Sequence, residues 1–205
     1  MKIEGEYLFD GPREAVWEIV RDPDVLATAL PGTQSLEQVS ENEYQGEMQV
    51  RIGPVGGLFS GRVVISDEVP PESLTMTVEG KGKPGFVNGS GAVHLSSQEN
   101  DKTLMQYQGD MEVGGRLASV GQRMMDSVSK SLLKQGMDSL NKALLAREDS
   151  EGTGEAVEYE APSEAEFAAS VAKDMAGEAF SSRRLWWILG AIVLILFILA
   201  IVYLR

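Results

Sequence analysis

Residues 113–125 read VGGRLASVGQRMM, and at this stretch the hydrophobic pattern of the chain changes. Before it, residues 102–113 alternate apolar and polar side chains, as a strand with one buried face does. From Leu117 onward, apolar residues recur at helical spacing up to about residue 145, and the first of them form one stripe: Leu117, Val120, Met124, Val128 and Leu132. The stretch therefore predicts a strand that ends at two glycines and leads into a long helix.

Glycine-rich stretches also occur in phosphate-binding loops, so that alternative has to be weighed. Residues 113–125 lack the Gly-Lys-Ser/Thr ending of such a loop, and they follow an antiparallel strand rather than opening a strand–helix–strand unit. We therefore interpret the small residues sterically. Gly114 and Gly115 permit a sharp turn, and the small side chains after them keep the helix slim against the sheet. Arg123 is interpreted as a solvated surface residue.

The rest of the first 146 residues reads as strands separated by turns. Residues 1–9 alternate, and two short helices are expected between residues 10 and 31. Further strand-like runs follow at 34–40, 43–53, 59–69, 73–80, 86–97 and 102–113. A meander of this length curls, and the long helix is the element that would cover its concave face. The predicted class is α+β, an antiparallel sheet wrapped around a C-terminal helix, which resembles the helix-grip (START-like, SRPBCC) superfamily.

The last part of the chain predicts a membrane anchor. Residues 185–204 contain no charge, and twenty residues of helix span about 30 Å, the thickness of the hydrocarbon core of a bilayer. Trp186 and Tyr203 lie where interfacial aromatic residues are found, and Arg183 and Arg184 precede the segment. We expect a single-pass transmembrane helix in the cytoplasmic membrane, with the N-terminal domain facing the cytoplasm; a buried core helix is the alternative.

Between the folded part and the anchor, residues 147–182 contain ten acidic and two basic residues. A segment of this composition buries too little apolar surface to fold by itself, so we expect a flexible acidic linker. The predicted organisation is a ligand-binding helix-grip domain at 1–146, the linker at 147–182 and the transmembrane helix at 185–204.

The composition excludes several classes of function. The formal net charge is −13, which argues against unaided binding to nucleic acid or to anionic lipid. The chain has no cysteine and only one histidine, His94, so a thiolate or imidazole-rich metal site is excluded. His94 alternates with Val93 and Leu95 and is expected to face outward. We find no nucleophile–base pair, and we therefore predict no catalytic residue and no metal site.

Three motifs, in this order, carry a resemblance to a known family: ALPG at 29–32, YQGEMQVRIGPVGGLFSGRV at 44–63 and VGGRLASVGQR at 113–123. Together they resemble the CoxG family of carbon monoxide dehydrogenase subunits. The resemblance covers about residues 1–146 and implies a helix-grip domain that associates with a molybdenum hydroxylase of the carbon monoxide dehydrogenase type. It also implies recruitment of that enzyme to the membrane and the handling of a quinone, menaquinone or ubiquinone, or a similar isoprenoid lipid.

Methionines and glycines in the predicted strands suggest a cavity under the helix. Methionine adapts to irregular apolar guests, although methionines also fill ordinary cores, and inward glycines leave space. Tyr44 and Tyr107 are candidate hydrogen-bond donors to a quinone carbonyl. The predicted cavity residues are Tyr44, Met48, Phe59, Val63, Met76, Val78, Met105, Tyr107, Leu117, Val120, Met124 and Val128. Two predicted loops, GPVGGLF and GKGKPGF, would admit the ligand and touch lipid headgroups through Leu58, Lys81, Lys83 and Phe86.

These observations favour a membrane-anchored, non-enzymatic subunit that binds an apolar ligand and recruits an oxidoreductase. Two alternatives remain open at this point. One is an anchor or assembly factor whose domain is filled by its own side chains and binds no ligand. The other is a polyketide-cyclase-like enzyme on the same fold, which convergent buried acids would indicate.

Overall fold

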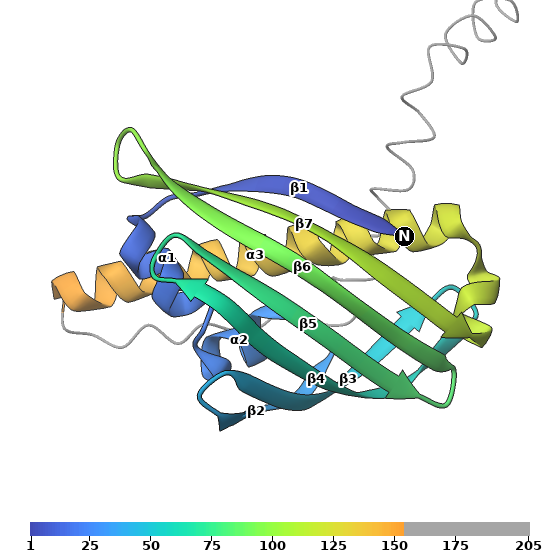
Figure 1. Cartoon of the computed structure of the whole chain (residues 1–205). Helices are drawn as coiled ribbons and strands as arrows, with labels where there is room; N and C mark the ends of the chain where they lie inside the picture. The colour runs from blue at the N-terminus through green and yellow to red at the C-terminus, as the bar shows by residue number, and fades with distance from the viewer. Residues whose placement is uncertain (154–205) are drawn as a thin grey trace, which may run out of the picture. The chain divides into compact units, whose positions relative to one another are not determined.

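A seven-stranded antiparallel sheet dominates the computed structural model of the protein, which describes residues 1–153 (Figure 1). The strands are β1 (Lys2–Phe9), β2 (Thr33–Ser40), β3 (Glu43–Ile52), β4 (Val55–Val69), β5 (Ser73–Gly82), β6 (Gly85–Gln98) and β7 (Lys102–Gly115). The helices are α1 (Arg13–Ile19), α2 (Pro23–Ala29), the short 3₁₀ helix η1 (Arg116–Val120) and the long helix α3 (Gln122–Thr153). The predicted α+β class and the antiparallel sheet with a C-terminal helix are confirmed.

The strand order explains why two helices interrupt the strands. Strands β2 to β7 form a meander, and β1 pairs with β7, so the order is β1-β7-β6-β5-β4-β3-β2. Strands β1 and β2 therefore lie at opposite edges of the sheet, and the chain between them has to cross it. Helices α1 and α2 make this crossing. Asp22 caps the N-terminus of α2, and its side chain accepts hydrogen bonds from the backbone N–H groups of Asp24 and Val25.

The tightly packed core lies at the end of the sheet where α1 and α2 sit. Because side chains alternate along each strand, the apolar face of the sheet turns toward the helices. Phe9, Val16, Ile19, Leu95 and Leu144 are at most 1% exposed and come from β1, α1, β6 and the far part of α3. These contacts pack the second half of α3 onto the sheet.

Polar contacts tie the edge strand β1 and the turn after it to the same helix. The Tyr7 hydroxyl donates to Oδ1 of Asp138 at 2.9 Å. Asp10 and Asn141 exchange two hydrogen bonds of 2.9 Å, one from the Asp10 backbone N–H and one from the Asn141 amide. Thr103 of β7, which is fully buried, donates to the carbonyl of Gly11 at 2.8 Å and fixes the same turn to the sheet. One edge of the sheet is thus held against α3 by side chains.

The sequence pattern predicted one continuous helix from about residue 116, and this prediction is wrong for the first turns. Gly121 has φ +91°, and it separates η1 from α3. The break changes the rotational phase of the helix, so Met125 is buried where the sequence pattern placed Met124. Helix α3 also continues to Thr153, seven residues beyond the expected domain boundary at 146.

Helix α3 is not a membrane span: no helix within residues 1–153 is both long and apolar enough to cross a bilayer. The predicted transmembrane helix at 185–204 and the predicted linker from residue 154 onward lie outside the described residues.

Gly85 and Gly61 offer a test of how closely the strands approach each other. Gly85 has φ +152°, and a Cβ there would overlap the carbonyl oxygen of Gly114, whereas a Cβ at Gly61 would meet its nearest atom at 3.6 Å. We expect Gly85→Ala to lower the free energy of unfolding by roughly 1–3 kcal/mol, because backbone has to shift. Gly61→Ala should leave it within about 0.5 kcal/mol of wild type or raise it. Denaturant unfolding of both variants measures the difference, and equal stabilities would contradict this packing.

Candidate ligand cavity

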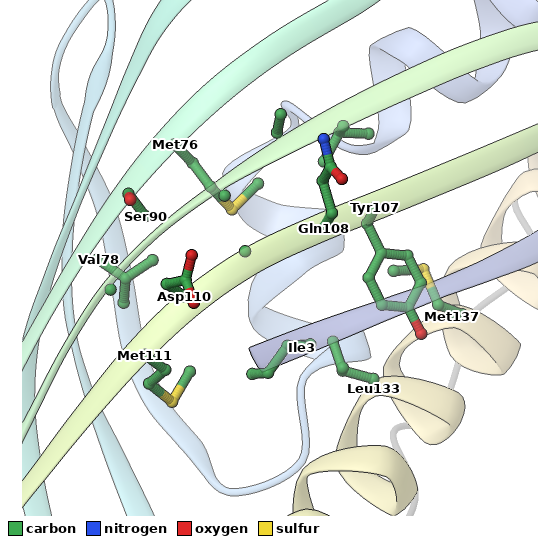
Figure 2. Close-up of a pocket in the computed structure, with 15 residues that line it drawn as sticks. Ile3, Met76, Val78, Ser90, Tyr107, Gln108, Asp110, Met111, Leu133 and Met137 are labelled. Atoms are coloured by element: carbon green, nitrogen blue, oxygen red, sulfur yellow. The ribbon is translucent and has the colours of Figure 1, made fainter. Parts of the chain in front are cut away.

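A cavity of about 240 Å³ lies between the middle of the sheet and α3 (Figure 2). Strands β1, β5, β6 and β7 form its floor and α3 forms its roof. Its lining residues are Ile3, Met76, Val78, Gly89, Ser90, Gly91, Ala92, Val93, Tyr107, Gln108, Gly109, Asp110, Met111, Leu133 and Met137. Ser90, Gln108 and Asp110 are exposed and alternate to the outer face, so the side chains that face α3 are almost all apolar.

Glycines on neighbouring strands create the space. Gly91 of β6 pairs with Gly109 of β7, and Gly89 lies two residues before Gly91 on the same face of β6. Because these three residues have no side chain, the floor of the cavity at their positions consists of backbone alone. A second, polar hollow of about 400 Å³ is lined by the same glycine pair together with outward residues such as Lys2 and Thr75. The sheet is thus only one backbone thick at this point.

Two more glycines lie at inward positions beyond the cavity, toward η1. Gly80 and Gly61 are cross-strand partners in the next rows of β5 and β4. A Cβ on either residue would meet only atoms of the sheet, such as Glu79 and Val87, within 4 Å and no atom of α3. Helix α3 therefore makes no close contact with the inner face at these two glycines.

Tyr107 provides a polar group in the otherwise apolar wall of the cavity. Figure 2 shows its ring projecting from β7 toward α3, beside Met137. The ring fits over Gly5, its partner on β1, where a Cβ would overlap the hydroxyl. Burial raises the pKa of this hydroxyl, which forms no hydrogen bond with another residue of the described part of the chain. Tyr107 therefore presents a neutral hydroxyl that is free to bind a ligand.

Tyr7 lies on the same face of β1 as Gly5, but its hydroxyl already forms a hydrogen bond within the protein. It donates to Asp138, whose other carboxylate oxygen accepts from Lys134 Nζ at 2.8 Å. Burial and the hydrogen bond to Asp138 raise the pKa of Tyr7 well above its ordinary value of 10. Tyr7 thus serves to hold β1 on α3 rather than to contact a ligand.

The structure brings three of the twelve predicted cavity residues together at the cavity: Met76, Val78 and Tyr107. Tyr44, Val63 and Met105 belong to the packed core instead. The Tyr44 hydroxyl donates to the carbonyl of Arg21 at 2.8 Å, so Tyr44 is not available as the predicted donor to a quinone.

The other six predicted residues lie nearer to η1: Met48, Phe59, Leu117, Val120, Met124 and Val128. Phe59 is buried against Gly82, and Met124 lies next to Gly53 in the turn between β3 and β4. They line the inner side of the domain beyond Gly61 and Gly80 rather than the cavity itself.

Sequence reasoning missed Leu133 and Met137 on the helix, and Ile3 and Met111 on the sheet. Leu133 and Met137 are four residues apart, a helical spacing, but the predicted stripe was followed only to Leu132. Ile3 and Met111 occupy inward positions of their strands, so the alternation contained the signal. Strand pairing was needed to place them beside the glycines.

The predicted entrance loops are tight hairpins. GPVGGLF is a turn at Gly53 and Pro54 followed by β4, and β5 and β6 are joined by Lys83 and Pro84 alone. Pro84 packs on Gly57, and its carbonyl accepts a 3.0 Å hydrogen bond from the backbone of Leu117. The loops predicted at these positions are therefore closed by backbone pairing.

The four residues predicted to admit the ligand lie on these hairpins. Lys81 and Lys83 are exposed, and the side chain of Leu58 is 44% exposed. The Phe86 ring, by contrast, is half-buried over Gly114.

Side chains suited to holding a metal ion do not cluster in the described part of the chain. Within residues 1–153, no three His, Cys, Asp or Glu side chains are placed to hold a metal ion. His94 is exposed on the outer face of β6, as its alternation predicted.

Comparison with known proteins gives the same fold and a family. The profile of the CoxG family of carbon monoxide dehydrogenase subunits matches residues 5–145. A conserved protein of Geobacillus kaustophilus has a similar structure, with 32% identity and a TM-score of 0.68 over 71% of this chain and 95% of that one. Among curated protein sequences, none matches significantly.

More distant structures share the fold alone. The Zhui aromatase/cyclase of Streptomyces sp. R1128 is 13% identical, with a TM-score of 0.58 over 74% of this chain and 98% of that one. A START superfamily protein of Mycobacterium smegmatis is also 13% identical, with a TM-score of 0.54 over 70% and 97%. The predicted START-like architecture is thereby confirmed.

The Tyr7–Asp138 contact predicts a pH dependence. Because the pKa of Tyr7 is raised in the folded state, the unfolded chain releases this proton first as the pH rises above about 10, and stability falls there. Tyr7→Phe lacks the proton and should not show this loss. We expect the free energy of unfolding of wild type to exceed that of Tyr7→Phe by about 1 kcal/mol at about pH 8 and by clearly less at about pH 11. Denaturant unfolding at both pH values checks this, and a constant difference would contradict the assignment.

Proposed function

Because this chain belongs to the CoxG family of carbon monoxide dehydrogenase subunits, we propose that it is a non-enzymatic accessory subunit of a molybdenum hydroxylase of the carbon monoxide dehydrogenase type. In this role it binds an apolar ligand beneath α3, a quinone such as menaquinone or ubiquinone or a related isoprenoid lipid. It also recruits the enzyme to the cytoplasmic membrane.

The observation that carries this proposal is the apolar cavity with one free hydroxyl. A quinone has a flat apolar ring with carbonyl oxygens, and it needs apolar walls and a hydrogen-bond donor. Met76, Val78, Leu133 and Met137 supply such walls, and Tyr107 supplies the donor. A neutral hydroxyl suits this task, because the raised pKa keeps its proton in place.

The size of the cavity fits the ring of a quinone better than a whole isoprenoid chain. An engineered apolar cavity of about 150 Å³ holds benzene, so about 240 Å³ has room for a larger ring system. The tail of the ligand would continue along the inward glycines Gly61 and Gly80, toward η1, where a Cβ would meet no atom of α3 within 4 Å. This path explains the glycines at inward positions, where they otherwise weaken a strand.

The proposed attachment to the membrane rests on the sequence. Residues 185–204 have the length and apolarity of a single span, and Arg183 and Arg184 before them favour a cytoplasmic domain. The segment 147–182 would connect this anchor to the domain. An acidic domain gains from such a tether, since its net charge repels it from an anionic bilayer.

The two alternative functions are less well supported. An anchor that binds no ligand would have a filled interior, whereas this one contains a cavity floored by three glycines. A cyclase-like enzyme would need an acid or base facing the ligand, and Tyr107 is the ionisable side chain that the described cavity turns toward α3. The likeness to an aromatase/cyclase, at 13% identity, concerns the fold only.

Ligand binding is tested by filling the cavity. Val78 faces the cavity, and Thr77 beside it on β5 is exposed on the outer face. The full chain, purified in detergent from a quinone-containing host, should yield an apolar ligand near one-to-one stoichiometry by mass spectrometry. Val78→Phe should lose most of this ligand while Thr77→Phe keeps it, and Tyr107→Phe should weaken binding of added quinone about 2- to 10-fold. Wild-type protein that is empty and takes up no quinone would rule out the carrier role.

Recruitment is tested separately in cells that contain the hydroxylase. Deleting residues 185–204 should move hydroxylase activity from the membrane fraction to the soluble fraction. Val78→Phe, which leaves the anchor intact, should keep the activity on the membrane. If the hydroxylase stays on the membrane in the deletion strain, this chain does not anchor it.

A further inference from the structure

The charges of the domain are separated along the strands, and this separation defines a surface. Five exposed cations, Arg51, Lys81, Lys83, Arg116 and Arg123, gather at the η1 end of the sheet; we call them the basic pole. We propose that the basic pole docks on the headgroups of anionic phospholipids and thereby orients the domain on the membrane. This inference rests on the membrane location proposed above.

The topology brings these cations together from three separate parts of the chain. The turn between β3 and β4, the turn between β5 and β6, and η1 all lie at the same end of the sheet (Figure 1). The contacts of Pro84 with Gly57 and Leu117 join the three segments, and Gly53 lies against Met124 at the start of α3. The cations of the basic pole therefore share one end of the domain.

Few acids balance these charges. The segments 49–60, 80–87 and 113–126 contain the five cations and a single acid, Asp126; two further exposed acids, Glu79 and Glu112, directly precede the second and third segments. Within residues 1–153, none of the five forms an ion pair, whereas Arg62 and Lys134 pair with acids elsewhere on the domain. The five charges are thus available to an external partner.

The opposite end of the sheet has the reverse composition. Four of its cations, Arg13, Arg21, Lys102 and Arg147, form ion pairs with acids. The acids of this end lie in or next to α1 and α2, at the end of β4 and in the turns after β1, β2, β4 and β6: Asp10, Glu14, Glu18, Asp22, Asp24, Glu41, Asp67, Glu68, Glu72, Glu99 and Asp101. A negatively charged surface attracts one end of such a domain and repels the other, so it orients the molecule.

An exposed apolar residue beside the cations favours a lipid surface over an acidic protein. Leu58 is 44% exposed on the outer face of β4, next to the Ser60–Lys81 pair. Cations with an adjacent apolar side chain suit the headgroup region, where the charge meets phosphate and the apolar group meets acyl chains. Along β5 the order is Val78 in the cavity, then Gly80, then Lys81, so docking would place this side of the cavity toward the bilayer.

The absence of cysteine makes this proposal directly testable. Leu58→Cys introduces one thiol into the full chain, where an environment-sensitive fluorophore can be attached, and Glu99→Cys labels the opposite end. The labelled chains are reconstituted into phosphatidylcholine vesicles with or without phosphatidylglycerol. With phosphatidylglycerol at low salt, we expect the label at residue 58 to shift to an apolar environment and the label at residue 99 to remain in water. High salt should reverse the shift.

A matched pair of charge reversals tests the cations themselves. Lys83 lies in the basic pole, and Lys142 is an exposed lysine on the part of α3 that runs toward the opposite end. Each cation near an anionic surface favours docking about fivefold, so Lys83→Glu should reduce the ratio of docked to free domain at least about fivefold. Lys142→Glu, with the same change in net charge, should not reduce it.

The outcomes separate this proposal from the proposed function. If the chain stays with the vesicles at high salt but the label at residue 58 remains in water on phosphatidylglycerol, lipid docking is wrong and an acidic protein partner accounts for the basic pole. Equal effects of Lys83→Glu and Lys142→Glu would also overturn it. If the chain leaves the vesicles at high salt, the anchor at 185–204 is wrong, while the shift at low salt still reports on the basic pole.

Discussion

A single helix has to cover a sheet that is about three times wider than itself, and most features of this domain depend on that mismatch. A helix is about 10 Å in diameter, whereas seven strands spaced about 4.8 Å apart extend over about 29 Å. The sheet can bury its apolar face only by curving around α3. Glycines inside the strands permit this curvature, and side-chain contacts such as Tyr7 with Asp138 hold the edge strand β1 on the helix.

The same mismatch divides the interior into a packed part and a hollow part. Where α1 and α2 add their side chains to those of α3, the core is filled by residues such as Phe9, Val16 and Leu144. Where α3 alone faces the sheet, the glycines of β6 and β7 leave a cavity. The packed core around α1 and α2 therefore lies beside the cavity, so the cavity can accept a ligand without disrupting that core.

Under the proposed function, ligand, partner and membrane fit together in one arrangement. The ligand would lie in the middle of the domain, and the basic pole would face the bilayer from which an apolar molecule has to enter. The acidic end, with its cations bound in ion pairs such as Arg21 with Glu68, would face away from the lipid. An accessory protein arranged in this way could exchange a quinone with the membrane while it holds an enzyme nearby.

The sequence by itself determined the fold class, the strands, the switch to helical spacing after residue 113 and the family, because these depend on local periodicity and on short motifs. It placed Met76, Val78 and Tyr107 correctly on the inner face by alternation. It could not show that the Tyr44 hydroxyl bonds to the backbone carbonyl of Arg21. Nor could it show that Leu133 and Met137 line the cavity from the helix, or that Gly121 breaks the helix. Strand register and helix phase decide these points, since a change of one residue in either turns a side chain from the cavity to the core or to solvent. Tertiary structure alone also gathered five cations, distant in sequence, at one end of the sheet.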